Sequence, residues 1–393
     1  MTRHVVVVGA SLAGHATARS LRDAGYDGAL TVVGDEPHRP YDRPPLSKGF
    51  LDGSLSAEDL ALEDAEEDLG ATWLVGQRAT SLERTSAGPA VTLDDGTVLL
   101  ADAVVLATGA RARRLPTAIG GDLAGVHSLR TLDDALALRA DLVPGARLVL
   151  VGAGFVGAEI AATAHHLGLD VTLVEATRTP LAGPLGAEVG AAVAGLHARH
   201  GVPLHAGVPV SALLGAERVE GVLLDDGTHL PADVVVVGVG SAPATGWLHG
   251  SGLDLDAVGA VRADRAGATA VPGVWAVGDC AAWWDDALGD HHRTEHWNDA
   301  LHRPRAVAAA ILGTAAPAAP APYFWSDQYG VRLQFAGRRH GDEVLTVEAG
   351  TLEGGDALVV WWRHGTPVAV LGMGQPKLFN RWKRGLGAAA VAA

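Results

Sequence analysis

Two segments have the glycine spacing that is typical of loops that bind the pyrophosphate of a dinucleotide. The first runs Gly9-Ala-Ser-Leu-Ala-Gly14 and the second Gly152-Ala-Gly-Phe-Val-Gly157. In this fingerprint the first glycine forms a tight turn and the second lets the backbone approach the phosphates. The third lets a helix pack closely, with its N-terminus facing the phosphates. Ser11 takes the middle position of the first segment, where its Cβ makes close approach harder and its hydroxyl can donate to a phosphate.

A carboxylate follows each glycine segment at the distance expected for a ribose ligand. Asp35–Glu36 begins 26 residues after Gly9, and Glu175 lies 23 residues after Gly152. A carboxylate there accepts a hydrogen bond from the ribose 2′-OH and repels a 2′-phosphate. Glu175 therefore predicts NADH rather than NADPH in the second site, and the nearby Arg178 is weak evidence to the contrary.

The elements around the two segments indicate an internal repeat. The stretch Val5–Gly14 recurs as Leu148–Gly157, and each copy is an apolar run, a glycine turn and a helical pattern. A second matched pair, Leu93–Thr97 and Leu224–Thr228, follows in the same order. Short apolar runs separated by helices are typical of βαβ units in parallel sheets. We therefore expect two dinucleotide-binding domains that hold a flavin and a nicotinamide; the alternative is that one of the two sites is merely structural.

The composition restricts how electrons can be handled. The single cysteine, Cys280, excludes a disulfide framework, a Cys-ligated iron–sulfur cluster and an intramolecular redox pair of thiols. Electron chemistry therefore requires a bound cofactor, and we expect Cys280 to be a buried structural residue. The acidic and histidine-rich stretch 285–296 lacks tight ligand spacing, so no metal is expected.

Charge is unevenly distributed along the 393 residues. The chain has 30 basic and 45 acidic residues, a formal net charge of −15, which excludes a surface made wholly for nucleic acid. Residues 321–393 carry eight basic and six acidic groups, and the stretch Lys377–Arg384 is either a basic docking patch or a solvated helix end. We found no signal peptide or membrane-spanning run and expect a cytoplasmic protein.

Five segments together resemble a known family. They are Pro37–Lys48, Gly152–Glu159, Ala276–Asp279, Glu295–Trp297 and Phe324–Gln328. These segments are similar to those of the FAD-dependent NADH:ferredoxin reductases, of the putidaredoxin reductase and aromatic-ring dioxygenase reductase type. The similarity runs along essentially the whole chain, and the departures are Ser11 and the segment Arg303-Pro-Arg305.

The resemblance implies an α/β fold of the glutathione reductase type. Two Rossmann-like dinucleotide-binding domains would be followed by a C-terminal α+β interface domain. The FAD domain would comprise residues 1–112 and 245–320, the NAD domain residues 113–244, and the C-terminal domain residues 321–393.

The resemblance also assigns residues to the two cofactors. Those assigned to FAD are Gly9, Ser11, Leu12, Ala13, Gly14, Asp35, Arg43, Lys48, Ala79, Thr108, Gly109, Arg130, Asp279, Glu295, His296, Trp297 and Trp325. Those assigned to NADH are Gly152, Gly154, Phe155, Val156, Gly157, Glu159, Glu175, Val239 and Gly240. Within the first set, Asp35 would bind the adenosine ribose, Asp279 the ribityl chain, and Trp297 and Trp325 would lie near the isoalloxazine.

Two of these residues, Lys48 and Glu159, are implied to be catalytic. Lys48 is the only lysine before position 377, and the resemblance places it beside Glu159 where nicotinamide and flavin meet. An ammonium there would stabilise negative charge that develops on the flavin as hydride arrives, and Glu159 would keep it oriented. The alternative is a structural salt bridge.

The activity implied is electron transfer from NADH through FAD to a one-electron carrier. The expected carrier is a [2Fe–2S] ferredoxin, with rubredoxin as a second possibility, and it would serve a cytochrome P450 or a ring-hydroxylating oxygenase. Two alternatives are an NADH oxidase or peroxidase, which would need a cysteine that Arg43–Ser47 lacks, and a redox-sensing flavoprotein that resembles apoptosis-inducing factor.

Overall fold

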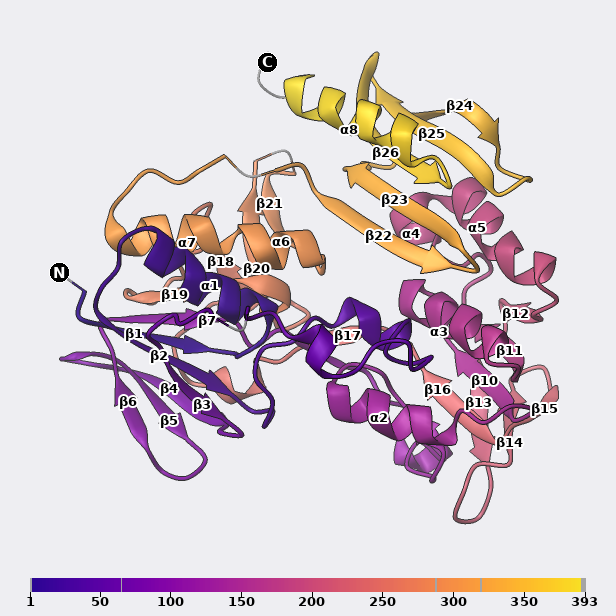
Figure 1. The fold of residues 1–393 in the computed structure, drawn as a ribbon, viewed down its shortest axis with the longest axis horizontal. Coiled ribbons are helices and arrows are strands. Elements are labelled where there is room, and N and C mark those ends of the chain that lie inside the picture. Colours follow the sequence, from indigo (N-terminus) through magenta and orange to yellow (C-terminus); the bar gives the residue numbers. More distant parts are fainter. Residues whose placement is uncertain (1, 65, 287, 319, 390–393) are drawn as a thin grey trace. The chain divides into compact units, whose positions relative to one another are not determined.

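The computed structural model describes residues 2–64, 66–286, 288–318 and 320–389 (Figure 1). The chain divides into two units, each of which gathers three separate segments. The first unit comprises Met1–Asp42, Leu60–Arg111 and Ser241–Pro320. The second comprises Arg43–Asp59, Ala112–Gly240 and Ala321–Ala393.

The first unit is built on a five-stranded parallel sheet of order β19-β7-β1-β2-β3. Its strands are β1 (His4–Val8), β2 (Ala29–Gly34), β3 (Thr72–Val75), β7 (Ala103–Leu106) and β19 (Val274–Ala276). Helix α1 (Leu12–Asp23) packs against β1 and against α6 (Trp297–His302) and α7 (Pro304–Leu312) (Figure 1).

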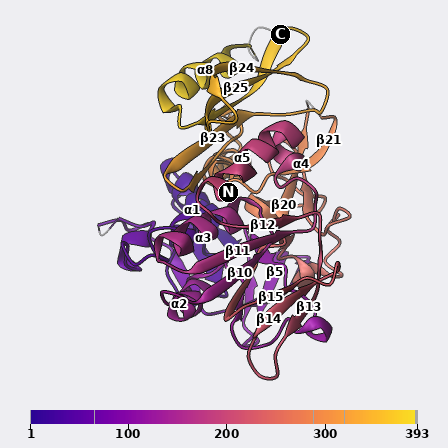
Figure 2. The same ribbon diagram turned by 90° about the vertical axis from the view of Figure 1, so that its right-hand side faces the viewer.

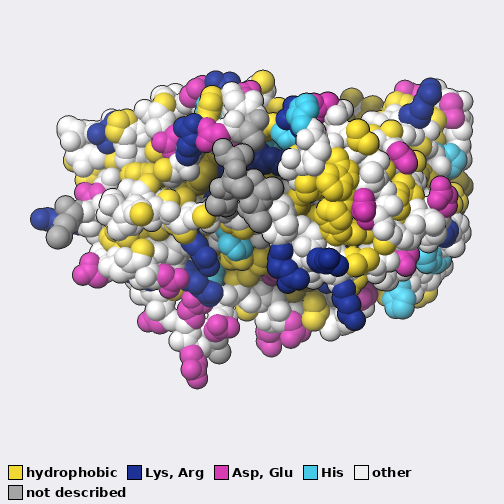
Figure 3. Space-filling model, turned by 90° about the horizontal axis from the view of Figure 1, so that it is seen from above, with side chains coloured by type: hydrophobic (Ala, Val, Ile, Leu, Met, Phe, Trp, Pro, Cys, Tyr) yellow, Lys and Arg dark blue, Asp and Glu magenta, His cyan; other side chains and the backbone are white. Residues whose placement is uncertain are grey.

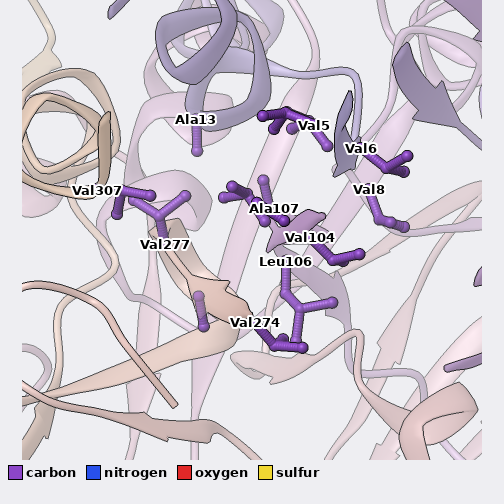
Figure 4. Packing of buried hydrophobic residues seen from close by; sticks show 14 of the residues in the cluster. Val5, Val6, Val8, Ala13, Val104, Leu106, Ala107, Val274, Val277 and Val307 are labelled. Atoms are coloured by element: carbon purple, nitrogen blue, oxygen red, sulfur yellow. The ribbon is translucent and has the colours of Figure 1, made fainter. Parts of the chain in front are cut away.

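Valines fill both faces of the central strand. Val5 to Val8 are each at most 3% exposed, which is typical of a parallel strand covered on both sides. Ala13 of α1, Val307 of α7 and Val277 lie in the same apolar cluster (Figure 4). This core fixes the end of β1, where the first glycine turn begins.

Smaller sheets complete the first unit. One is antiparallel and contains β4 (Ala79–Thr85), β5 (Gly88–Leu93) and β6 (Val98–Leu100). Another contains β18 (Val261–Ala263), β20 (Ala281–Asp285) and β21 (Asp290–Arg293). Strands β8 (Ala110–Ala112) and β17 (Ser241–Pro243) lie where the chain passes between the units.

The second unit repeats the plan of the first. Its parallel sheet has the order β12-β11-β10-β16-β9. The strands are β9 (Val126–His127), β10 (Arg147–Val151), β11 (Asp170–Glu175), β12 (Leu204–Ala206) and β16 (Val234–Val237). Gly9 N donates to Val33 O and Gly152 N to Val174 O, both at 2.7 Å, so the two glycine turns are bonded to the neighbouring strand in the same way. The predicted duplication is therefore present in the fold.

Helices and a further antiparallel sheet surround this second parallel sheet. The helices are α2 (Leu132–Asp141), α3 (Phe155–His166), α4 (Ala182–Leu185) and α5 (Ala187–Arg199). The antiparallel sheet contains β13 (Val210–Leu214), β14 (Gly221–Leu224) and β15 (His229–Pro231).

The C-terminal part of the second unit is an antiparallel sheet of order β22-β23-β26-β25-β24. Its elements are β22 (Tyr323–Gln328), β23 (Val331–Gly337), β24 (Val344–Thr351), β25 (Asp356–Arg363), β26 (Thr366–Met373) and the helix α8 (Pro376–Ala389). Helices α4 and α5 lie between this sheet and strands β10 to β12 (Figure 2). Val189 and Val193 of α5 share one apolar cluster with Leu333, Phe335 and Trp361, which explains why the two parts form one unit. Among the described residues, no helix has both the length and the apolar character needed to cross a membrane.

A buried histidine helps to attach the C-terminal sheet to α5. His197 is 1% exposed, and its Nδ1 lies 2.8 Å from the hydroxyl of Tyr329 in the β22–β23 turn. The ring of His200 stacks on the Tyr329 ring, with the two ring centroids 4.3 Å apart. Burial, with a smaller contribution from His200, lowers the pKa of His197 to about 4, and burial raises the pKa of Tyr329.

We expect this histidine to make the protein acid-sensitive. The unfolded chain binds a proton at position 197 below about pH 6.5, whereas the folded chain does so only below about pH 4. The contribution of His197 to the free energy of unfolding is therefore fully present above pH 6.5, and about 3 kcal/mol of it is lost as the pH falls to 4. In urea unfolding at pH 5 and 7.5, His197→Gln should reduce the difference between the two pH values, while the exposed-site control His229→Gln should not. An undiminished difference in His197→Gln would contradict this role.

Candidate functional site

The first glycine turn is closed so tightly that only glycine fits. Gly9 has φ +123°, and a Cβ there would lie 2.1 Å from the carbonyl oxygen of Ala107. A Cβ on Gly14 would lie 1.7 Å from Gly9 O. Both distances are far below van der Waals contact, so helix α1 can begin directly at the end of β1 only with glycine at these two positions.

The second turn is built in the same way, and the backbone at its middle glycine is open. A Cβ on Gly152 would lie 2.3 Å from Gly238 O, and one on Gly157 would lie 2.2 Å from Gly152 O. A Cβ on Gly154, by contrast, would meet nothing within 4 Å, so the backbone at the middle position faces open space. A pyrophosphate needs this arrangement, since it must approach the backbone closely.

The N-termini of the two following helices suit an anion. Ser11 and Gly154 are the N-cap residues of α1 and α3, and neither provides a side-chain capping hydrogen bond. Neither first turn contains an acidic residue. The first-turn amides and the positive end of the helix dipole are therefore suited to phosphate, which supports the fit of a dinucleotide to each turn. The predicted residues of these turns are Leu12, Ala13 and Gly14 in α1 and Phe155, Val156 and Gly157 in α3.

The acids predicted to bind ribose are placed differently in the two copies. Glu175 follows Val174 directly, and its Oε2 accepts from Ala153 N in the glycine turn at 3.0 Å. In the first copy the equivalent position is Gly34, where a Cβ would lie 2.5 Å from the Cβ of Ala10. Asp35 comes one residue later and forms a 3.3 Å ion pair with Arg111. The spacing in the sequence did not reveal this one-residue offset.

The other predicted FAD residues of the first unit lie at the ends of its strands. Ala79 is buried at the start of β4, and Thr108 and Gly109 follow β7. Asp279 follows β19 in the segment Gly278–Cys280, and a Cβ on Gly278 would lie 2.9 Å from the Cβ of Ala13 in α1. This segment and the start of α1 are thus in close contact, as a shared cofactor site requires.

The Glu295–Trp297 segment is held by specific polar contacts within the first unit. Trp297 Nε1 donates to Asp42 Oδ1 at 2.7 Å. Glu295 accepts from the hydroxyl of Ser241 and pairs with Arg293 at 2.7 Å. Burial lowers the pKa of His296, the N-cap residue of α6, so a neutral imidazole is favoured there.

The remaining predicted residues belong to the second unit. Arg43 donates to the carbonyl of Arg130 at 2.6 Å. Trp325, on β22, stacks on Tyr323 with ring centroids 6.0 Å apart. Val239 and Gly240 follow β16, and Gly240 has φ +97°.

Lys48 and Glu159 form a largely buried ion pair within the second unit. Lys48 Nζ lies 2.7 Å from Glu159 Oε2, and the two side chains are 22% and 6% exposed. The same oxygen accepts from the Ser47 hydroxyl at 2.6 Å, and Oε1 accepts from the Ser326 hydroxyl at 2.7 Å. Asp327 N is a further donor to Oε1 at 3.3 Å. The carboxylate therefore has four donors from two chain segments that are distant in sequence from α3.

Sequence reasoning paired Lys48 with Glu159 but missed the two serines that complete the network. Both lie in segments that had been singled out, Ser47 directly before Lys48 and Ser326 directly after Trp325. Thr163, one turn along α3 from Glu159, also donates to the carbonyl of Ser47 at 2.8 Å. The sequence showed that each serine lies next to a motif residue, but only the fold shows that both hydroxyls bind Glu159.

Cys280 takes no part in a redox pair. It is 0% exposed, and burial raises the pKa of its thiol, so the reactive thiolate is disfavoured. The described residues contain no group of three or more His, Cys, Asp or Glu side chains placed to hold a metal ion.

The chain belongs to the pyridine nucleotide-disulphide oxidoreductase family, which matches residues 3–303. Residues 323–393 match the reductase C-terminal family. Oxidoreductases of this kind use FAD and NAD(H), and the predicted fold class and family resemblance are confirmed.

Named relatives and a solved structure are similar over nearly the whole chain. The chlorobenzene dioxygenase ferredoxin reductase component of Cupriavidus sp. (strain PS12) is 39% identical, over 96% of this chain and 91% of the relative. The benzene 1,2-dioxygenase system ferredoxin–NAD(+) reductase subunit of Pseudomonas putida is 38% identical over the same shares. The crystal structure of the covalent putidaredoxin reductase–putidaredoxin complex matches with a TM-score of 0.92 and 35% identity, over 97% of this chain and 92% of that one.

We expect the Lys48–Glu159 pair to stabilise the fold. A double-mutant cycle with Lys48→Met and Glu159→Gln should give a coupling of about 2 kcal/mol in urea unfolding, because removing either partner leaves a largely buried charge unpaired. The control cycle uses Arg147→Met and Asp233→Asn, a pair whose side chains are 45% and 46% exposed. That pair should give less than about 1 kcal/mol. Equal coupling in the two cycles would show that burial of Glu159 adds nothing.

Proposed function

We propose that this protein is an NADH-dependent ferredoxin reductase, in which electrons pass from NADH through FAD to a one-electron carrier protein. The observation that carries the proposal is the presence of two glycine turns, each shaped for a dinucleotide, in a chain whose single thiol is buried. With no thiol pair to relay electrons, the bound flavin is the redox centre. The reductase subunits and components among the relatives support the same activity.

The chemistry that the bound cofactors supply is hydride transfer from NADH to FAD, followed by release of single electrons from the reduced flavin. The chain's own part is to bind and orient them. The turn at Gly9–Gly14, with Asp35, Ala79 and Asp279, holds FAD. The turn at Gly152–Gly157, with Glu175 and the Val239–Gly240 segment, holds NADH. The remaining residues predicted for FAD and NADH in the sequence keep those assignments.

Three domains carry out these tasks in the proposal. Residues 1–112 and 245–320 form the FAD domain, residues 113–244 the NAD domain, and residues 321–393 the C-terminal interface domain. The match of a separate family to residues 323–393 supports the last boundary. We place the activity in the cytoplasm, which supplies the NADH.

Lys48 supplies a positive charge that favours reduction of the flavin. Glu159 holds the ammonium at 2.7 Å, and the carbonyl of Pro44 accepts a second bond from it at 3.0 Å. A cation fixed in this way costs little reorganisation when negative charge develops nearby. The serines that bind Glu159 keep the carboxylate from rotating away.

The proposed carrier is a [2Fe–2S] ferredoxin, with rubredoxin as the alternative, and it serves a cytochrome P450 or a ring-hydroxylating oxygenase. Such carriers are usually acidic, so a protein of net charge −15 needs a local basic surface to receive one. Helix α8 provides it through the exposed Lys377, Arg381 and Arg384. Figure 3 shows basic side chains on the face seen from above, which is the side on which α8 lies in Figure 1.

We expect rapid NADH-dependent reduction of cytochrome c only when a [2Fe–2S] ferredoxin is added. The reductase alone should transfer electrons to cytochrome c at least about tenfold more slowly, because its surface is complementary to the ferredoxin and not to cytochrome c. Raising the salt concentration should slow the ferredoxin-dependent rate, since the encounter is between opposite charges. A rate that ignores the ferredoxin would contradict the proposal and favour an oxidase.

We expect Lys48→Met to slow flavin reduction by NADH about tenfold or more while FAD stays bound. Stopped-flow absorbance at the flavin band measures the rate, and the spectrum of the desalted protein measures FAD retention. The control Arg147→Met removes an ion-paired cation from the start of β10, at the end of the strand opposite the glycine turn. An unchanged reduction rate in Lys48→Met would leave the ion pair with a structural role alone.

A further inference from the structure

The carboxylate of Glu175 is held by the residue two positions after it. Its Oε1 accepts from Thr177 N and from the Thr177 hydroxyl, both at 2.8 Å. Its Oε2 accepts from Ala153 N in the glycine turn at 3.0 Å. Thr177 thus holds one carboxylate oxygen, and the glycine turn holds the other.

Counting acceptor sites shows what this leaves for a ligand. An ionised carboxylate has about four lone-pair sites, two on each oxygen. Thr177 takes both sites on Oε1, and Ala153 takes one on Oε2. One site remains, and it lies on Oε2, the oxygen bonded to the turn where a pyrophosphate would bind.

The Thr177 hydroxyl has one proton and two neighbouring acceptors. The carbonyl of Thr179 lies 3.2 Å away, compared with 2.8 Å for Glu175 Oε1. A bond to an ionised carboxylate is shorter and stronger than one to a neutral carbonyl, so the proton goes to Glu175.

Arg178 does not compete for this carboxylate. It forms no ion pair with any residue in the part of the chain that the structure describes. Arg178 is among the residues that line a cavity of about 500 Å³, together with Ala191 and Ala194 of α5 and with Pro203 and Leu204, and Glu175 is not one of them. Among the described residues, the negative charge of Glu175 is therefore not neutralised by an ion pair with Arg178.

We infer that Thr177 is a positioning residue for coenzyme selection: it fixes Glu175 so that the carboxylate accepts one hydroxyl of the coenzyme's adenosine ribose and repels a 2′-phosphate. The accepted hydroxyl is the 2′-OH, the group that a carboxylate at this position of a dinucleotide fold binds. The inference rests on the proposed function, in which the second glycine turn holds NADH.

The first test removes the Thr177 hydroxyl and measures coenzyme binding directly. Thr177→Val should weaken binding of NAD⁺ and of ADP-ribose about fivefold by calorimetry. It should raise KM for NADH by a similar factor without changing kcat with ferricyanide as acceptor. It should also lower the preference for NADH over NADPH, because the carboxylate is no longer fixed. Thr177→Ser keeps the hydroxyl and should restore wild-type binding.

A matched control is Thr346→Val. The Thr346 hydroxyl also donates to a glutamate two residues away, Glu348 Oε1 at 2.7 Å, and it accepts from Trp362 Nε1 at 2.8 Å, but it lies on β24 in the C-terminal sheet. This variant should bind NAD⁺ as the wild type does. A loss equal to that of Thr177→Val would overturn the inference, because it would reflect general destabilisation.

The second test uses the wild-type protein and altered ligands. ADP-ribose that lacks the adenosine 2′-OH should bind about tenfold more weakly, whereas the 3′-deoxy analogue should bind almost normally. Equal losses for the two analogues, or unchanged binding in Thr177→Val, would overturn the inference while leaving the reductase proposal intact. Failure of the wild type to bind NAD⁺ or ADP-ribose at all would overturn both.

Discussion

The second unit depends on the burial of one carboxylate. Glu159 is 5% exposed, and removing a carboxylate from water costs several kcal/mol unless charge and hydrogen bonds replace the lost hydration. Lys48 and Ser47 supply this from one segment, and Ser326 and Asp327 supply it from another. Each of these segments is therefore bound to α3 by polar contacts in addition to apolar packing. This explains why residues 43–59 belong to the second unit although the chain on both sides of them belongs to the first.

A second constraint, close backbone approach, made the duplication visible in the sequence. Gly9, Gly14, Gly152 and Gly157 each occupy a position where a Cβ would lie 1.7–2.3 Å from a carbonyl oxygen. Only glycine fits at such positions, so the repeated glycine spacing can be recognised in the sequence without a structure. Middle positions are less restricted, since a Cβ on Gly154 meets nothing within 4 Å, and this explains how Ser11 is tolerated at the equivalent place.

What the sequence could not provide depends on contacts between distant segments. Ser47 and Ser326 bind the same carboxylate although 279 positions separate them, and no local pattern marks such a pairing. In the C-terminal sheet β26 lies between β23 and β25, and this order brings together strand residues that pack against α5 on one side and α8 on the other. The offset of Asp35 relative to Glu175 was hidden because spacing alone does not determine which residue ends a strand. In each case the residue types were evident, whereas their partners required the fold.

The charge of α8 illustrates why a partner surface must be judged group by group. Four basic residues lie between positions 377 and 384, but Lys383 Nζ lies 3.8 Å from the centre of the Tyr323 ring, and burial lowers its pKa. Its charge lies over the Tyr323 ring of the C-terminal sheet and is stabilised by it, and its side chain is only partly exposed. Lys377, Arg381 and Arg384 are exposed, so three charges rather than four can meet an acidic carrier. The apolar side of the same helix, through Phe379 and Leu386, is buried against the sheet. The helix therefore fixes the direction of its basic face by the same packing that attaches it to the protein, and this lets a strongly acidic chain present a small basic surface in a defined place.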